Sequence, residues 1–318
     1  MKNLARCLAL AALLPLAAAA QSFPTRAVRL MVPFPPGGAT DIIGRLVAAK
    51  MQEVWGQPVV IENKPGAGTV VGTDYVAKSA PDGTTLGMVV TAYVINPSLR
   101  TDLPYNTLKD LSGVTQVSVQ HLVMTAHPSL QANTIPELIA LAKKNPGKLA
   151  YATPGSGTAM HLSVELLKTT AGIDLMHVPY KGGAPAQQDV VAGHVPILMD
   201  VLYAVQPLIN SGKIKVLALL SPRRAPESPQ YPLVAEAVPG VSALSIVGIV
   251  APAATPRELV NRISSDIARA VKSSDLTERM KQQGMEPIGS TPDQFDALIR
   301  AEIEKWAKVV KASGAKVD

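Results

Sequence analysis

Short apolar runs alternate with segments of helical periodicity along most of the chain, and this alternation limits the fold more than any other feature. The first run, residues 27–34, leads into the loop residues Pro35 to Gly38, and apolar residues then recur at helical spacing from Ile42 to Met51. Further strand-like runs fall at residues 58–62, 84–90, 121–126, 149–153, 175–178, 195–200, 214–221 and 245–251. Because such alternation favours parallel strands joined by right-handed helical crossovers, we predict an α/β fold of mainly parallel sheets flanked by helices.

Composition places the chain among folded proteins and removes several function classes. Hydrophobic residues make up 47% of the 318 residues against 17% charged, which excludes disorder and favours two domains. The formal charge of +6 comes without a basic run, so nucleic-acid binding is unsupported. Cys7 is the single cysteine, which excludes a disulfide framework, and the five histidines are scattered, so we expect neither a metal site nor a cofactor.

The first twenty residues have the pattern of a signal peptide. Lys2 and Arg6 precede an apolar run over residues 7–17, and small residues follow up to Ala20. We therefore expect cleavage after about Ala20 and export to the periplasm. An N-terminal membrane anchor is the alternative, but the run is shorter than the roughly 20 residues that a membrane-spanning helix needs. Cys7 stands at the start of the run, directly after Arg6, whereas a lipid-anchored cysteine would follow the run.

Two glycine-rich loops connect a strand to a helix and carry the strongest functional signal. One loop covers residues 34–41, with the sequence FPPGGATD, and the other covers residues 151–158, with the sequence YATPGSGT. Glycine lets the backbone approach a ligand closely, and the free N–H groups of a first helical turn favour an anion. The loops therefore predict a carboxylate site built largely from backbone groups. The alternative is that both are ordinary strand-to-helix turns.

A third loop and two polar pairs are weaker signals. Gly66, Gly68 and Gly72 approach a dinucleotide fingerprint, but no acidic residue follows at the required place, so we predict a pocket wall instead. Ser156 and His161 suggest a hydrolase, yet residues five apart on a helix point about 140° away from each other. Asp41 fits a helix first turn, and Asp200 at a strand end fits a ligand contact or a structural role equally well.

Taken together, the motifs resemble one family. The segments VPFPPGGATDIIGR, VIENKPGAGTVVG, APDGTTLGMV, YATPGSGTAMHLSVELL, HVPYKGGAPAQQDVVAGHV and APAATPRELV follow in the order typical of the Bug family, the TctC-like extracytoplasmic solute-binding receptors of tripartite tricarboxylate transporters. The resemblance implies a two-lobe periplasmic binding protein fold of the second type, with the ligand between the lobes. It implies lobe 1 over residues 21–122 and 246–318, and lobe 2 over residues 123–245.

The resemblance also implies which residues contact a ligand. The two main loops of the family grip a carboxylate through backbone groups and ordered waters, and the third loop and two strand ends lie nearby. Matched by position, the implied ligand-binding residues are Phe34, Gly37, Gly38, Asp41, Ala67, Gly68, Thr91, Tyr151, Thr153, Gly155, Ser156, Gly157, His161 and Asp200.

By the same resemblance, the ligand is a di- or tricarboxylate, an acidic amino acid or an aromatic acid. It would be passed to a membrane permease of one large and one small subunit, and we expect a monomer without catalysis. An exported hydrolase using Ser156 or Asp200, and a sensory carboxylate-binding protein, are the alternatives. One departure concerns residues 244–248, where family members often carry a tryptophan and this chain reads LSIVG, so we expect a roomier or differently shaped cleft.

Overall fold

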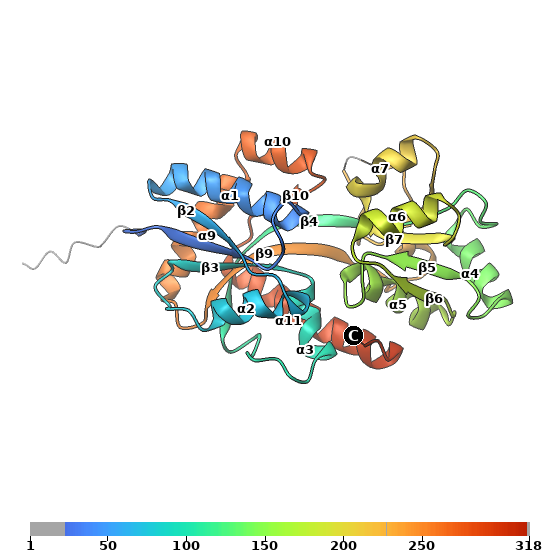
Figure 1. Ribbon diagram of the computed structural model, residues 1–318, viewed down its shortest axis with the longest axis horizontal. Helices are drawn as coiled ribbons and strands as arrows, with labels where there is room; N and C mark the ends of the chain where they lie inside the picture. Colours follow the sequence, from blue (N-terminus) through green and yellow to red (C-terminus); the bar gives the residue numbers. More distant parts are fainter. Residues whose placement is uncertain (1–22, 227, 317–318) are drawn as a thin grey trace, which may run out of the picture.

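The computed structural model describes residues 23–226 and 228–316, and it contains two lobes joined by two long strands. Figure 1 shows the lobes side by side, with β4 (Leu111–Ala126) and β9 (Leu244–Pro252) running between them. The signal peptide expected over residues 1–20 lies outside the described residues.

Lobe 1 combines the N-terminal strand–helix units with the C-terminal helices. Its strand β1 lies between β2 and β3, and all three are parallel, with Val28 opposite Val59 and Arg29 opposite Thr85. Its elements are β1 (Val28–Val32), α1 (Ala39–Trp55), β2 (Val59–Asn63), the 3-10 helix η1 (Ala67–Thr69), α2 (Val70–Ala77), β3 (Thr85–Val90), α3 (Ala92–Leu99), α9 (Arg257–Val271), α10 (Ser274–Gln282), β10 (Glu286–Pro287) and α11 (Pro292–Ser313).

Lobe 2 repeats the same architecture in the middle of the chain. Its strand β5 lies between β6 and β7, again in parallel, with Tyr151 opposite both His177 and Ile197. Its elements are α4 (Ile135–Lys144), β5 (Ala150–Thr153), α5 (Ala159–Ala171), β6 (Met176–Pro179), α6 (Gly183–Val191), β7 (Ile197–Val201), α7 (Leu202–Asn210), β8 (Lys215–Leu219) and α8 (Val234–Ala237).

The strand β4 belongs to both lobes. From Leu111 to His121 it pairs antiparallel with β9, and from Leu122 to Ala126 it pairs antiparallel with β7 on one side and β8 on the other. The partner therefore changes between His121 and Leu122. The strands follow the order β2-β1-β3-β9-β4-β7-β5-β6, so one continuous path of pairing passes through both lobes.

The outer strands of each lobe are parallel, as predicted, and the connecting strands add antiparallel pairs at the centre. The strand β4 begins ten residues before the apolar run at 121–126 that predicted it. Its first part carries Thr115, Ser118 and Gln120, which are all buried. Thr115 Oγ1, for example, donates to the carbonyl of Ser290 at 2.7 Å. Because these buried polar residues interrupt the apolar ones, the first part of β4 has no hydrophobic run for sequence analysis to detect.

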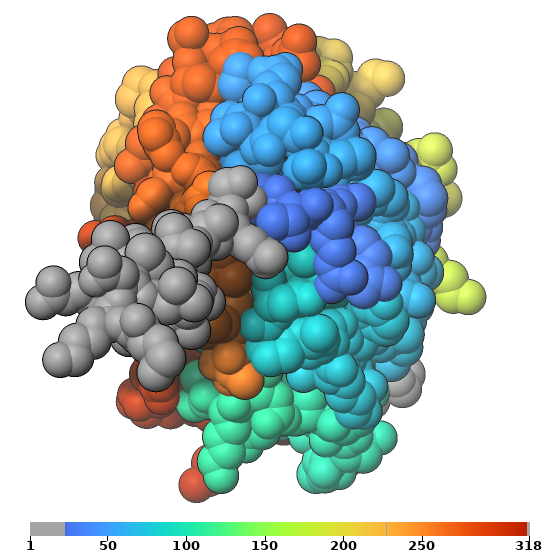
Figure 2. Space-filling view, turned by 90° about the vertical axis from the view of Figure 1, so that its left-hand side faces the viewer, coloured from blue at the N-terminus to red at the C-terminus, as the bar shows by residue number. Residues whose placement is uncertain are grey.

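Segments from the two ends of the chain build lobe 1 together. Figure 2 shows the blue and cyan N-terminal segments beside the orange C-terminal ones on the end face of the molecule. Residues such as Val47 and Met51 of α1 share a core with Ile263 and Ile267 of α9. Among the described residues, no helix combines the length and apolar character needed to cross a bilayer.

The closing helix α11 buries one apolar face. Thr291 and Gln294 form a complete capping box at its start. Phe295, Ile299 and Trp306 are buried, and the helix contacts α3, β4 and, in lobe 2, α5. It therefore ties the two lobes together on one side.

Candidate functional site

A cleft of about 500 Å³ lies between the lobes, where the carboxyl ends of β1, β2 and β5 meet the connecting strands. Ligands of open α/β sheets bind outside the carboxyl ends of strands, so this is the expected place for a site. The lining residues are Phe34, Ala39, Thr40, Ala67, Gly68, Thr69, Val90, Thr91, Ala92, Asn96, Arg100, Gln120, Ser156, Gly157, Thr158, Ala159, Met160, Ser245, Val247 and Met285.

The first glycine loop is shaped by Asp41, whose side chain is buried. Its Oδ2 accepts hydrogen bonds from the Gly37 N–H at 2.9 Å and from Arg45 Nε at 2.8 Å. Its Oδ1 accepts from Asn63 Nδ2, which also donates to the carbonyl of Phe34. The hydrogen bond from Arg45 is the main reason that the pKa of Asp41 falls to about 2, so the carboxylate stays charged at neutral pH.

Within this loop, the structure separates the residues that line the cleft from those that shape it. Phe34 lies in the lining, together with Ala39 and Thr40 of the first turn of α1. Gly37, Gly38 and Asp41 are outside the lining. No side chain caps the N-terminus of α1, so its first N–H groups remain available at the cleft.

The third loop has a strained backbone at the cleft wall. Ala67 and Thr69 both have positive φ angles, 47° and 81°, on either side of Gly68 at 62°. A β-branched residue such as Thr69 rarely adopts this conformation, and strain of this kind gathers at functional sites. Asn96 of α3 holds the loop, because its Nδ2 donates to the carbonyl of Gly68 at 2.9 Å.

The second glycine loop leads into α5, whose first turn faces the same cleft. Ser156, Gly157, Thr158, Ala159 and Met160 all belong to the lining. Thr158 caps the helix, because its Oγ1 accepts from the N–H of His161 and donates to the carbonyl of Gly155 at 2.8 Å. The N-termini of α1 and α5 thus converge on one cavity from opposite lobes.

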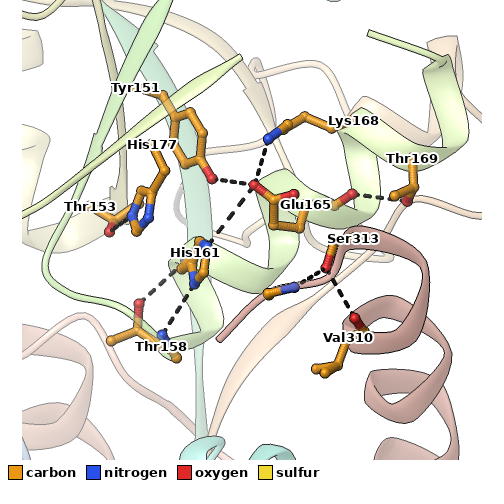
Figure 3. Close-up of polar contacts among 12 residues, drawn as sticks. Tyr151, Thr153, Thr158, His161, Glu165, Lys168, Thr169, His177, Val310 and Ser313 are labelled. Atoms are coloured by element: carbon orange, nitrogen blue, oxygen red, sulfur yellow. Dashed lines mark hydrogen bonds and ion pairs between the residues drawn. The ribbon is translucent and has the colours of Figure 1, made fainter. Parts of the chain in front are cut away.

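Beneath the second loop, three rings form a stack. The rings of His161 and His177 lie 4.0 Å apart and nearly parallel, and Tyr151 stacks on the other face of His177 at 4.9 Å, as Figure 3 shows. Thr153 Oγ1 is 2.7 Å from His177 Nε2. Tyr151, Thr153 and His161 are buried, and none of the three belongs to the cleft lining. They support the loop from below.

His161 is held neutral by its surroundings. Burial, with a smaller contribution from the positive charge of Lys168, lowers the pKa of His161 to about 4. Its Nδ1 accepts the Gly157 N–H at 3.1 Å, so in the neutral ring the proton is on Nε2, which faces Glu165 Oε1 at 4.0 Å. Glu165 in turn accepts from Tyr151 and Lys168 (Figure 3).

Asp200, at the end of β7, also lies outside the lining. Its Oδ2 accepts from Gln187 Nε2 at 2.9 Å and its Oδ1 accepts from the N–H of Val201. Burial raises the pKa of its carboxyl above the ordinary value. Of the residues predicted from the sequence, the lining contains Phe34, Ala67, Gly68, Thr91, Ser156 and Gly157, and it lacks Gly37, Gly38, Asp41, Tyr151, Thr153, Gly155, His161 and Asp200.

Several lining residues escaped the sequence analysis, among them Asn96, Arg100 and Gln120. Asn96 and Arg100 follow β3, and the rule that ligands bind at the carboxyl ends of strands could have pointed to them. No glycine motif marks the connection between β3 and α3. Ser245 and Val247 of β9 also line the cleft. Nearby, Gly248 leaves room for the Phe295 ring on the other face of β9.

Comparison with known proteins places these features in context. A profile described as "Tripartite tricarboxylate transporter family receptor" matches residues 43–315. Protein BugT of Bordetella pertussis is 37% identical over 301 residues, which is 94% of this chain and 92% of that protein.

Solved structures are similar over nearly the whole chain. A structure from R. palustris with adipate is 34% identical, with a TM-score of 0.81, and the match covers 93% of this chain and all of that one. MatC from Rhodopseudomonas palustris with bound malate is 31% identical, with a TM-score of 0.77, and the match covers 91% of this chain and all of that one. The similarity confirms the predicted two-lobe α/β fold.

Proposed function

Because the chain belongs to the tripartite tricarboxylate transporter receptor family, we propose that it captures a small carboxylate in its cleft and delivers it to a membrane permease of that transporter class. The convergence of the N-termini of α1 and α5 on one cavity carries this proposal. Both turns present backbone N–H groups and the positive end of a helix dipole, which together favour an anion.

The two relatives with adipate and malate support this ligand class, since both molecules are dicarboxylates. The predicted contact residues then act in two ways. Those in the lining, such as Gly68 and Ser156, would meet the ligand directly, whereas Asp41 and His161 would hold loop N–H groups in place from outside the lining.

Binding would close the lobes about the connecting strands. The division proposed from the sequence, with lobe 2 over residues 123–245, agrees with the change of β4 partner between His121 and Leu122 and with the start of β9 at Leu244. The proposal also includes export, cleavage after about Ala20 and action as a periplasmic monomer.

We further propose that the protein is not an enzyme. A serine hydrolase needs a base that can accept the proton of its nucleophile. The candidate base for Ser156 is His161, but its Nδ1 already accepts the Gly157 N–H and its other nitrogen faces Glu165. Ser156 itself serves better as a wall of the anion site.

A thermal-shift measurement tests the proposed function. We expect adipate, malate or another small carboxylate to raise the melting temperature of the mature chain, whereas the matching neutral diamides leave it unchanged. At a hundredfold excess over Kd the stabilisation is about 2.7 kcal/mol, equivalent to a few degrees for a chain of this size. A flat response to mono-, di- and tricarboxylates and acidic amino acids would contradict the proposal.

A further inference from the structure

Among the described residues that line the cleft between the lobes, Arg100 is the one that carries a charge. It follows α3 and is partly buried. Arg26, Arg45, Arg223 and Arg269 each pair with a carboxylate, but no ion pair among the described residues involves Arg100. Its Nε is buried and has no hydrogen-bond partner in the structure. The guanidinium of Arg100 therefore borders the cleft without a protein carboxylate, in the described part of the chain, to balance its charge.

Gly68 and Thr69 line the cleft together with Arg100. Gly68 lies beside the guanidinium, because a β-carbon there would be in van der Waals contact with Arg100 Nη2, at 3.6 Å. Thr69, on the same wall, is 4% exposed, and its Oγ1 also lacks a hydrogen-bond partner. A buried hydroxyl without a partner, on a residue with strained backbone, is costly unless a ligand completes it.

The lining of the cleft extends along α3, from Ala92 at its start to Arg100 just after its end. At 1.5 Å per residue, α3 is about 12 Å long. The first turns of α1 and α5 line the same cleft, so a ligand held there by backbone N–H groups shares the cavity with Arg100.

We propose that Arg100 determines specificity by pairing with the second carboxylate of a dicarboxylate whose first carboxylate lies at the N-termini of α1 and α5. This rests on the proposed function and narrows it to dicarboxylates. A guanidinium offers two parallel N–H donors that match a carboxylate, and Thr69 Oγ1 adds a further donor. Loss of such a charge-assisted contact weakens binding about tenfold to a hundredfold.

Calorimetric titration of the mature chain tests this inference. The ligands are the linear diacids from succinate to suberate and the monoacids of equal chain length. We expect the best diacid to bind at least tenfold more tightly than its monoacid. Arg100→Gln should reduce this preference to less than threefold, because diacid affinity falls further than monoacid affinity. Arg100→Lys, which keeps the charge but loses the paired donors, should show an intermediate preference.

Arg279→Gln is the matched control, because Arg279 is exposed on α10 away from the cleft. It should keep the full preference for diacids. A diacid preference that survives in Arg100→Gln, or its absence from the unmodified protein, overturns the role of Arg100 and leaves the proposed function standing. Failure of the unmodified protein to bind any carboxylate defeats the proposed function itself.

Discussion

At the scale of single residues, the glycine loops at the cleft are held in place by side chains that lie outside the cleft lining. His161 fixes the Gly157 N–H through an unprotonated Nδ1, and Asp41 fixes the Gly37 N–H through a charged carboxylate. The pKa of His161 is lowered to about 4, which keeps its Nδ1 unprotonated. The pKa of Asp41 is lowered to about 2, which keeps its carboxylate charged. Each residue therefore holds its loop with one protonation state from mildly acidic to neutral pH.

His161 makes stability depend on pH. The folded protein keeps His161 neutral down to a pKa of about 4, whereas the unfolded chain takes up the proton near pH 6.5. The contribution of His161 to the free energy of unfolding should thus be fully present above pH 6.5. It should be lost as the pH drops from 6.5 to 4, which lowers the free energy of unfolding by on the order of 3 kcal/mol. Urea denaturation at several pH values should show His161→Gln losing most of this dependence.

The control for His161 is His194→Gln. His194 is an exposed histidine whose side chain is 71% accessible and pairs only with Asp189. We expect its substitution to leave the pH dependence between 4 and 6.5 as it is. An unchanged pH profile in His161→Gln would show that other groups cause the acid sensitivity.

At the scale of elements, the two ends of α5 carry glycines with different functions. A glycine with a left-handed backbone stands at each end, Gly157 with φ 73° before the first turn and Gly172 with φ 62° at the C-cap. Only Gly157 lines the cleft and donates its N–H to His161. The two positions share a backbone requirement but differ in function.

Alanine at either glycine should cost about 1–2 kcal/mol of stability, because a side chain disfavours the left-handed conformation. Gly157→Ala should also lower carboxylate affinity at least tenfold, since the loop N–H groups move out of place. Gly172→Ala should retain affinity, because nothing lies within 4 Å of a β-carbon there. Chemical denaturation and calorimetric titration of both variants measure the two effects, and equal affinity loss in both would refute this separation.

At the scale of the whole molecule, the lobes share one large core. A single cluster of buried residues includes Met31 and Tyr93 of lobe 1 together with Leu138 and Leu162 of lobe 2. The helix α11 contacts elements of both lobes, and β4 contributes to both sheets. Unfolding of one lobe would therefore expose apolar surface of the other.

We expect one cooperative unfolding transition in differential scanning calorimetry, with equal calorimetric and van't Hoff enthalpies. A saturating carboxylate should move the whole transition upward, because residues of both lobes line the proposed site. Two resolved transitions, with only one shifted by the ligand, would mean that the lobes unfold independently despite the shared core.

The sequence predicted much of this architecture from local patterns. Alternating apolar runs located the strands. In the structure the side chains of Thr134 and Thr291 cap the N-termini of α4 and α11. At α9, by contrast, no side chain caps the N-terminus, because the helix begins after Pro256 and the buried Thr255 hydroxyl has no hydrogen-bond partner in the structure.

By itself, then, the amino-acid sequence determined the α/β class and the glycine loops suited to an anion, because both depend on spacing within a few residues. Tertiary structure alone decided that β4 pairs in two sheets, that Tyr151 and His161 lie below their loop, and that Arg100 faces the cleft without a carboxylate. These outcomes depend on residues brought together from distant segments. Periodicity cannot report such contacts, since it records only which face of an element is buried.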